Sequence, residues 1–256
     1  MIKFLEILGG SIIKVIEQMG QLMLFVINTL IWIFRPPLRI RAIFKQMEFV
    51  GVKSLFVVIL TGSFTGAVMT IQIFYGFSMF RAESLVSATL AIAMARELGP
   101  VLTALMVAGR AGSAIAAELG TMRVTEQIDA LYVMAANPVK FLVVPRVLAG
   151  VVMLPILTVI SNVMGIVGGF LVGVGLLDIN RGIFINNIVE YLDVSDVFNG
   201  LIKSAVFGLI LTLIGCYKGF YTTGGAEGVG KSTTEAVVMA SILILASDYV
   251  MTAIMF

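Results

Sequence analysis

The sequence has no histidine and a single cysteine, Cys216, which stands within an apolar run. A disulfide framework needs paired cysteines, and serine or cysteine nucleophiles are commonly activated by histidine, so the inventory excludes both arrangements. Metal sites built on histidine are excluded for the same reason. The composition therefore does not favour an enzyme, and it indicates no catalytic residue, metal or cofactor.

Charged residues are also scarce. They make up 12% of the 256 residues, about half of the roughly 25% that is typical of soluble domains. The mean hydropathy is +1.07, and apolar runs recur along nearly the whole chain. Because many of them exceed the roughly 18 residues that mark a spanning helix, we predict an all-α membrane protein that crosses the bilayer several times.

Five segments are long enough to cross a bilayer core of about 30 Å. They are residues 54–77, 85–107, about 147–177, 200 to about 220, and 236–256. Residues 1–34 differ, because their apolar part, 21–34, is short, follows a stretch bearing Lys3, Glu6, Lys14 and Glu17, and ends at Arg35-Pro36-Pro37. We interpret 1–34 as an interfacial or re-entrant elbow, so that 1–53 comprises the amphipathic elbow and a basic segment, and 54–256 is a five-helix domain.

The distribution of Lys and Arg predicts the orientation. Residues 1–53 hold seven of them, the loop after the second span holds four, and the loop after the fourth span holds two. The opposite side carries Arg81 and Arg181. Under the positive-inside rule the N-terminus is cytoplasmic and the C-terminus lies outside. A sixth span within 1–34 would place the basic residues of 35–53 on the wrong side.

The longest outer segment is predicted over residues 178–199. It carries four acidic residues against one arginine. Its apolar side chains have the spacing of one short amphipathic helix on the outer surface; they are Ile183, Phe184, Ile188 and Val189.

Two charges, Arg96 and Glu97, fall within the second span and are followed by Pro100. Each charge costs about 2.5 to 3.5 kcal/mol on insertion scales, so both are expected to face a cavity or a partner. Pro100 frees the carbonyl of Arg96 and is expected to kink the helix. Two interpretations remain open: a polar lining for a headgroup or ion, and an ion pair that braces helices. Lys203 and Asp248 are expected to lie near span ends and to snorkel.

A short helix is predicted over residues 125–136 in the loop after the second span. Thr125 is expected to cap it, and Asn137-Pro138 to end it. Apolar residues occupy both of its faces, which favours a protein groove as its partner, although packing on its own bundle is the alternative.

Residues 225–232, GAEGVGKS, match the phosphate-loop pattern in every position. That mechanism needs a strand before the loop and a helix after it, in an α/β domain, and here a membrane helix precedes it. We therefore predict no nucleotide site but a flexible glycine loop, with Ser232 to Glu235 as a capping box that opens the last span. Gly165, Gly169 and Gly173 form small-residue repeats that favour packing within the chain over a dimer seam.

Several of these segments together resemble the MlaE (YrbE) permeases of MCE-type ABC lipid transporters, over almost the entire chain. The resemblance rests on RELGPV at 96–101, AGRAGS at 108–113, Ala117-Glu118, Thr125-Glu126-Gln127 and the ending 248–256. It implies a permease that moves phospholipid between the inner and outer membranes of a bacterium, located in the inner membrane with a periplasmic C-terminus.

The resemblance also implies partners and residue roles. The partners are a second copy of the chain, two cytoplasmic ABC ATPases, a hexameric periplasmic MCE-domain protein and, in the Gram-negative version, a small STAS-domain protein; nucleic acid is not among them. The segment 125–136 would be the coupling helix, with contacts from Thr125, Glu126, Gln127, Ile128, Asp129 and Leu131. The lipid pocket would be lined by Arg96, Glu97, Lys203, Gln72 and Tyr75.

Two other functions are compatible with the residues. A secondary transporter would couple transport to protons through Glu97 or Asp248. Such folds usually show internal repeats, and we find no convincing internal repeat in this sequence. A membrane anchor for an ATPase or MCE complex would leave Arg96 and Glu97 without a role. The direction of transport and the lipid species do not follow from the sequence.

Overall fold

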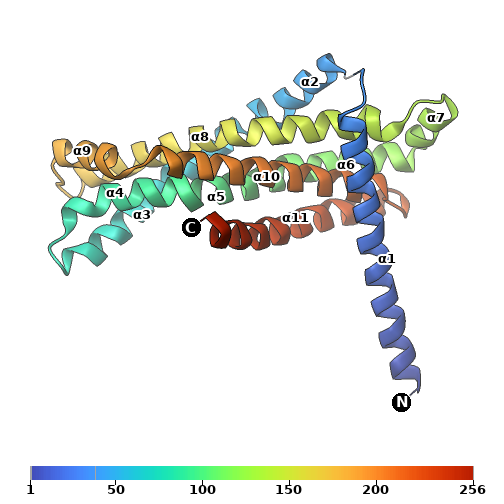
Figure 1. The fold of residues 1–256 in the computed structure, drawn as a ribbon, viewed down its shortest axis with the longest axis horizontal. Helices are drawn as coiled ribbons and strands as arrows, with labels where there is room; N and C mark the ends of the chain where they lie inside the picture. The colour runs from blue at the N-terminus through green and yellow to red at the C-terminus, as the bar shows by residue number, and fades with distance from the viewer. Residues whose placement is uncertain (1, 38, 256) are drawn as a thin grey trace.

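The computed structural model describes residues 2–37 and 39–255; before Met19 it describes only the side chains of Ile13, Ile16 and Glu17. Within these ranges the chain forms helices and no strand. Five segments are long and apolar enough to cross a membrane: Ile40–Ser78, Glu83–Val124, Val139–Gly175, Val194–Phe220 and Gly225–Met255. The predicted all-α class and the five spans are confirmed. The loops after the second and fourth spans lie at one end of the bundle, the α7 end, and α9 lies at the other (Figure 1).

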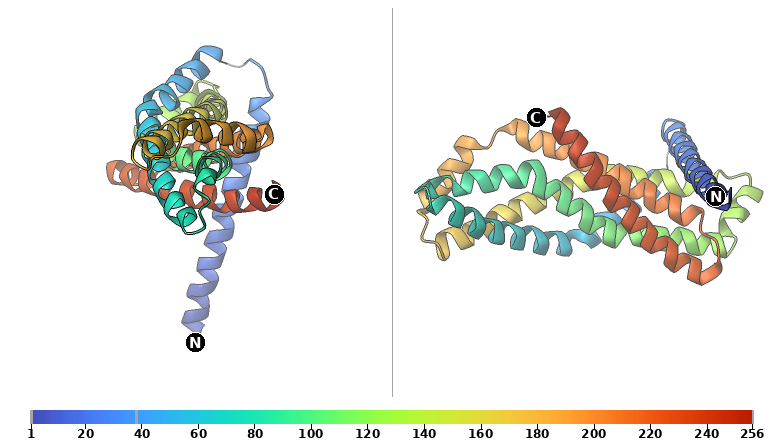
Figure 2. Two further views of the ribbon diagram at one scale, coloured as in Figure 1. Left: turned by 90° about the vertical axis from the view of Figure 1, so that its left-hand side faces the viewer. Right: turned by 90° about the horizontal axis from the view of Figure 1, so that it is seen from below.

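The N-terminal helix α1 (Ile2–Ile33) runs roughly perpendicular to the bundle near the α7 end (Figures 1 and 2). Its apolar part, Met19–Ile33, is shorter than a span, as the elbow interpretation predicted. Phe25 fixes it to the bundle by ring contacts with Tyr217, Phe220 and Tyr221, at centroid distances of 5.7, 5.9 and 6.1 Å. The side chains of Lys3, Glu6 and Lys14, on which its amphipathic character depends, lie outside the described set.

The first two spans contain several helices each. The first combines α2 (Ile40–Val50), a short 3-10 turn and α3 (Leu55–Ser78). The second combines α4 (Val86–Ala93), α5 (Gly99–Val107) and α6 (Ser113–Val124), joined by π-helical turns at Met94–Leu98 and Ala108–Gly112. The predicted end of this span at residue 107 is wrong. Arg110 donates to the carbonyl of Phe49 and to Ser54 Oγ, so its charge stays within the bundle.

The remaining elements complete the bundle. They are α7 (Gln127–Val133), a π-helical turn at Val139–Val143, α8 (Val144–Gly175), α9 (Arg181–Tyr191), α10 (Val194–Phe220) and α11 (Gly225–Met255). A helix predicted within residues 178–199 is present as α9: Asn180 caps it by accepting from Gly182 N and Ile183 N, and Phe184 is fully buried. Pro155 lies inside α8.

Glycines allow α3 and α8 to pack backbone against backbone. A Cβ on Gly66 would lie 1.8 Å from the carbonyl oxygen of Gly165, and a Cβ on Gly62 would lie 2.8 Å from that of Ser161. Gly169 faces Leu90 and Thr70, and Gly173 faces Phe184. The predicted use of this repeat for packing within the chain is confirmed.

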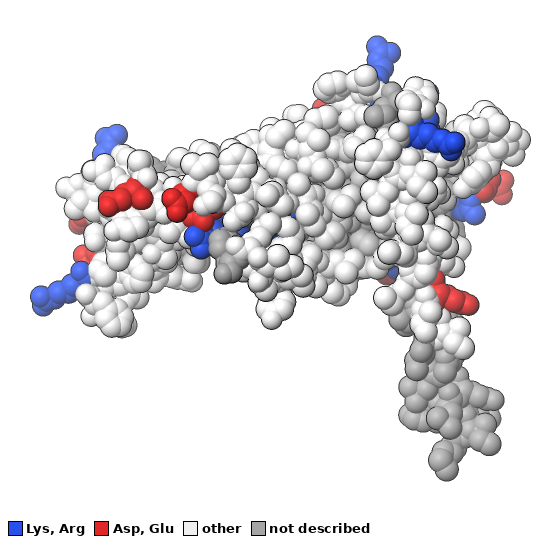
Figure 3. Space-filling model, in the orientation of Figure 1, with Lys and Arg blue, Asp and Glu red and all other residues white. Residues whose placement is uncertain are grey.

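Charged side chains on the face drawn in Figure 3 gather toward the two ends of the bundle and are sparse between them. This is the distribution that a bilayer requires, because its hydrocarbon core leaves exposed charges without solvation. The charges within the spans must therefore be satisfied inside the bundle.

Candidate functional site

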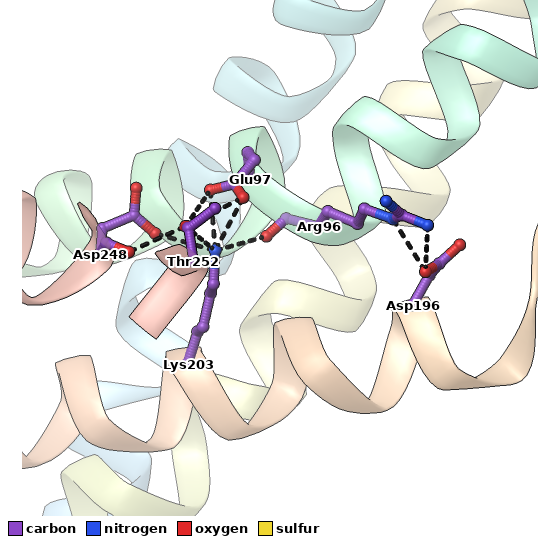
Figure 4. Close-up of polar contacts among 6 residues, drawn as sticks. All are labelled: Arg96, Glu97, Asp196, Lys203, Asp248 and Thr252. Carbon is purple, nitrogen blue, oxygen red and sulfur yellow. Dashed lines mark hydrogen bonds and ion pairs between the residues drawn. The ribbon is translucent and has the colours of Figure 1, made fainter. Parts of the chain in front are cut away.

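The side chain of Lys203, on α10, is fully buried at the centre of a charged cluster (Figure 4). Its ammonium donates to both carboxylate oxygens of Glu97, each at 2.8 Å. The ammonium also donates to two side chains of α11, Asp248 Oδ1 at 3.2 Å and Thr252 Oγ1 at 2.7 Å. The prediction that Lys203 and Asp248 snorkel toward a span end is wrong, since the lysine finds its counter-charges inside the bundle.

The π-helical turn at Met94–Leu98 directs two neighbouring charges to different partners. Glu97 points to Lys203, and Arg96 extends away from it (Figure 4). Pro100 has no N–H, so the carbonyl of Arg96 loses its usual helical donor. Lys203 Nζ lies 3.3 Å from that oxygen and replaces it. Where a kink was predicted before Pro100, the structure has a π-helical turn, a form often found at functional sites.

Arg96 pairs with Asp196 of α10. Its Nε and Nη2 lie 2.8 and 2.7 Å from the same oxygen, Oδ1. The Asp196 side chain is 3% exposed, whereas that of Arg96 is 36% exposed. The arginine is thus anchored yet accessible.

Together these contacts join the second span to α10 and α11. Sequence reasoning identified Arg96 and Glu97 as charges within a span, but it expected Lys203 and Asp248 to snorkel and missed Asp196 and Thr252 as partners. Asp196 was counted only as one of the acidic residues of segment 178–199. A threonine such as Thr252 is common in apolar helices, so its sequence context did not indicate a functional role. The bracing interpretation describes what the ion pairs do within one chain; contact with a lipid stays a prediction.

Gln72 and Tyr75 lie on α3, and both side chains are exposed in the single chain; Tyr75 is 64% exposed. They continue a stripe of exposed apolar side chains at four-residue spacing. Its members are Phe56, Leu60, Phe64 and Val68. A polar glutamine at the end of such a stripe is a candidate pocket residue if a second chain covers this face.

The predicted coupling helix is present as the shorter α7, but Thr125 does not cap it. Thr125 Oγ1 donates to Thr121 O as a continuation of α6, and Glu126 adopts a left-handed conformation with φ 58° where α7 begins. The predicted stop at Asn137-Pro138 is late, because α7 ends at Val133. Asn137 Oδ1 instead accepts from the N–H groups of Val139 and Lys140 at the start of the next helix.

The six predicted coupling residues face in different directions. Ile128 is fully buried and Leu131 packs partly against the core. Asp129 pairs with Arg123 at 2.6 Å, and Gln127 Nε2 donates to Thr125 Oγ1. The outward apolar side chains are Tyr132, Val133 and Met134, with exposures of 54, 88 and 67%. The α7 end thus presents an apolar tip.

Comparison with known proteins identifies the family. The family model "Permease MlaE" matches residues 43–254. The chain belongs to the MlaE permease family. It is 47% identical over 249 residues to a probable ABC transporter permease protein of Rickettsia bellii, covering 97% of this chain and 96% of the relative. It is 37% identical over 258 residues to the intermembrane phospholipid transport system permease protein MlaE of Haemophilus influenzae, covering 100% and 98%.

A plant relative extends the comparison. The chloroplast protein TRIGALACTOSYLDIACYLGLYCEROL 1 of Arabidopsis thaliana is 42% identical over 212 residues, which cover 83% of this chain and 61% of the relative. The MlaE family match contains the charged cluster and α7 and excludes all of α1. The chain is accordingly a multi-pass membrane permease of the kind found in ABC transport systems.

The phosphate-loop pattern of this MlaE permease lies in a helix. The predicted loop at 225–232 and the capping box at Ser232 are wrong, because α11 begins at Gly225. A Cβ on Gly228 would lie 1.8 Å from the carbonyl oxygen of Thr223, so glycine permits the tight turn into α11. Lys218 pairs with Glu235 at 2.8 Å, which fixes α11 to α10. Packing and this ion pair outweigh the low helix propensity of glycine.

Proposed function

We propose that this chain is the transmembrane subunit of an ABC transporter that moves phospholipid between the inner and outer membranes of a bacterium. The observation that carries the proposal is the position of Arg96, whose side chain is anchored by a buried aspartate within a span and remains 36% exposed. The name of the Haemophilus relative supports the substrate class.

The chemistry of Arg96 suits a phospholipid. A planar guanidinium can bind a phosphate through two parallel hydrogen bonds, which a neutral lipid does not offer. Glu97, with Gln72 and Tyr75 from the α3 face, completes the proposed pocket. Lys203 is fully buried and contributes by holding both carboxylate oxygens of Glu97. We propose that a second copy covers the α3 stripe, so that the pocket forms between two chains, as in a homodimer.

Energy for transport comes, in this proposal, from two cytoplasmic ATPases docked at the α7 end. The basic residues near this end support a cytoplasmic position. The α9 end faces the periplasm, where a hexameric MCE-domain protein receives or delivers lipid, and a small STAS-domain protein accompanies the ATPases in the Gram-negative version. Family membership and ABC permease relatives support the ATPase partner more directly than the other two.

Proton-coupled transport is the less favoured alternative. Glu97 and Asp248, its candidate proton carriers, both accept hydrogen bonds from the buried Lys203, so they already serve as counter-charges that join the second span and α11 to α10. A non-transporting anchor is also less favoured, since it gives the accessible Arg96 no role.

The proposed pocket is tested by neutralising Arg96 and its partner together. Arg96→Gln with Asp196→Asn removes both charges of this pair and leaves neither one unpaired, so the permease should fold. If Arg96 holds the phosphate, ATP-driven lipid transfer between membranes should fall about tenfold or more, since hydrogen bonds to charged groups contribute about 1.5–3 kcal/mol. The measurement is transfer of fluorescent phospholipid by the reconstituted complex.

Two comparisons make that result specific. Arg81→Gln removes an exposed charge elsewhere and should leave transfer unchanged. Thermal stability of the double variant is measured alongside transfer. Normal transfer in the double variant would show that Arg96 only braces α10, and a loss that follows unfolding would also contradict the pocket.

The apolar tip of α7 is tested with a matched pair of substitutions. Val133→Asp should release the ATPase, because a charged group in an interface core commonly costs 2 kcal/mol or more. Val189→Asp, on α9 at the opposite end, has a similar starting exposure, 77% against 88%, and should retain the ATPase. Co-purification in detergent, measured as the ATPase to permease ratio, decides between them. Equal ATPase to permease ratios in the two variants would show that the ATPase does not bind at α7.

A further inference from the structure

A cavity of about 410 Å³, here named the elbow cavity, lies where α1, α10 and α11 meet at the α7 end. Its size falls within the range of about 300–1,000 Å³ that is usual for ligand pockets. α1 contributes Met19, Gln21 and Leu22 to its lining. Polar side chains come from α10, α11 and the turn between them, and they are named the polar wall here: Tyr221, Lys218, Lys231 and Ser232.

The polar wall carries an excess positive charge. Lys218 Nζ lies 2.8 Å from one carboxylate oxygen of Glu235, and Lys231 Nζ lies 4.0 Å from the other. Among the described lining residues, two lysines therefore share one carboxylate. The side chain of Lys231 is 78% exposed and can turn toward a ligand. An anion between the lysines would balance the remaining charge.

The two lining residues Lys231 and Ser232 come from the segment that matches the phosphate-loop pattern. Because the segment is helical, its backbone N–H groups from Gly228 onward are used in helical hydrogen bonds, beginning with Gly228 N to Gly224 O, and cannot cradle a nucleotide. Side chains can still bind phosphate there: an ammonium from Lys231 and a hydroxyl from Ser232. Burial raises the pKa of the Tyr221 phenol, with a smaller contribution from nearby Tyr217, so Tyr221 remains a hydrogen-bond donor at neutral pH.

The position of the cavity favours a lipid over a soluble ligand. The fourth span ends at Phe220, beside the ring cluster of Phe25 and Tyr221, and aromatic side chains of this kind are enriched at membrane interfaces. α1 runs across the bundle here and exposes Met19 and Met23, at 66 and 61%. A phospholipid could place its phosphate against the polar wall and its chains along this apolar helix.

We propose that the elbow cavity binds the headgroup of an anionic phospholipid from the leaflet at the α7 end, with the phosphate between Lys218 and Lys231. This site is separate from the Arg96 cluster and does not depend on lipid transport. A bound lipid touches α1, α10 and α11 together, and so holds the elbow against the bundle.

The site is tested by photo-crosslinking the full-length permease in phosphatidylcholine nanodiscs that contain a photoreactive phosphatidylglycerol. Labelled peptides should include the segments of α1, α10 or α11 that line the cavity. Lys231→Gln should reduce this labelling about tenfold, because one charged phosphate contact is lost. Adding Lys218→Gln with Glu235→Gln should abolish it without leaving an unpaired carboxylate.

Several comparisons decide the outcome. Lys45→Gln removes an exposed lysine of α2 and should leave labelling unchanged, as should Arg96→Gln with Asp196→Asn. Equal labelling in wild type and Lys231→Gln would overturn the site. Loss of labelling on adding soluble glycerol phosphate or ATP, at concentrations well below those of the lipid, would assign the cavity to a soluble phosphate and overturn the lipid proposal.

Discussion

Lys203→Met is expected to lower the free energy of unfolding by about 3 kcal/mol or more, because breaking a buried ion pair leaves uncompensated charge. Without the ammonium, Glu97 and Asp248 face each other with no cation between them. The expected value lies at the low end of the usual 3–5 kcal/mol, since the Glu97 side chain is 37% exposed. The loss of stability is measured as a fall in the temperature at which half of the purified permease remains monodisperse.

Removing the opposing charges at the same time should restore much of the loss. The triple variant Lys203→Met, Glu97→Gln and Asp248→Asn keeps the shapes of the side chains and leaves no net charge in the cluster. Lys45→Met, at an exposed position of α2, should have little effect. If Lys203→Met were as stable as Lys45→Met, the cluster would not hold α11 to the bundle.

Gly66→Ala should destabilise the permease by about 3 kcal/mol, at the upper end of the cost of overpacking. The new methyl group would lie 1.8 Å from the carbonyl oxygen of Gly165, and backbone cannot turn aside as a flexible side chain can. α3 and α8 would have to separate along their main contact. The same stability measurement applies.

Gly76→Ala is the matched control on the same helix. A Cβ at Gly76 meets nothing within 4 Å, so the substitution should be neutral or slightly stabilising through helix propensity. Equal stability of the Gly66 and Gly76 variants would mean that α3 and α8 do not pack as closely as described.

Composition predicted the fold class and number of spans because hydrocarbon thickness fixes the length of an apolar helix. Span boundaries failed where polar side chains are satisfied by distant partners. Arg110 made the second span seem to end early, yet it bonds to Phe49 and Ser54, and Glu118 pairs with Arg146 at 2.8 Å. A single sequence does not show such pairings, because the partners are far apart along the chain.

In the candidate site, too, the sequence predicted the residues that are costly in themselves and missed the pairings between distant residues. Arg96 and Glu97 were predicted to face a cavity or a partner because a charge inside a membrane span is costly wherever it lies. Their partners Asp196 and Lys203 stand 100 and 106 residues away, and only the fold brings them together. The start of α11 was mispredicted because glycine was given its average local preference, whereas Gly228 is required by close contact with Thr223.

The Lys203 cluster also has an order of assembly, because ribosomes deliver the chain from its N-terminus. Glu97 is synthesised 106 residues before Lys203, so the lysine meets its first counter-charge as soon as α10 enters the membrane. Asp248 follows 45 residues later and Thr252 four after that. Until then a nascent chain displays an incomplete polar cluster in the bilayer. A chain truncated before α11 would therefore leave Lys203 without its partners Asp248 and Thr252.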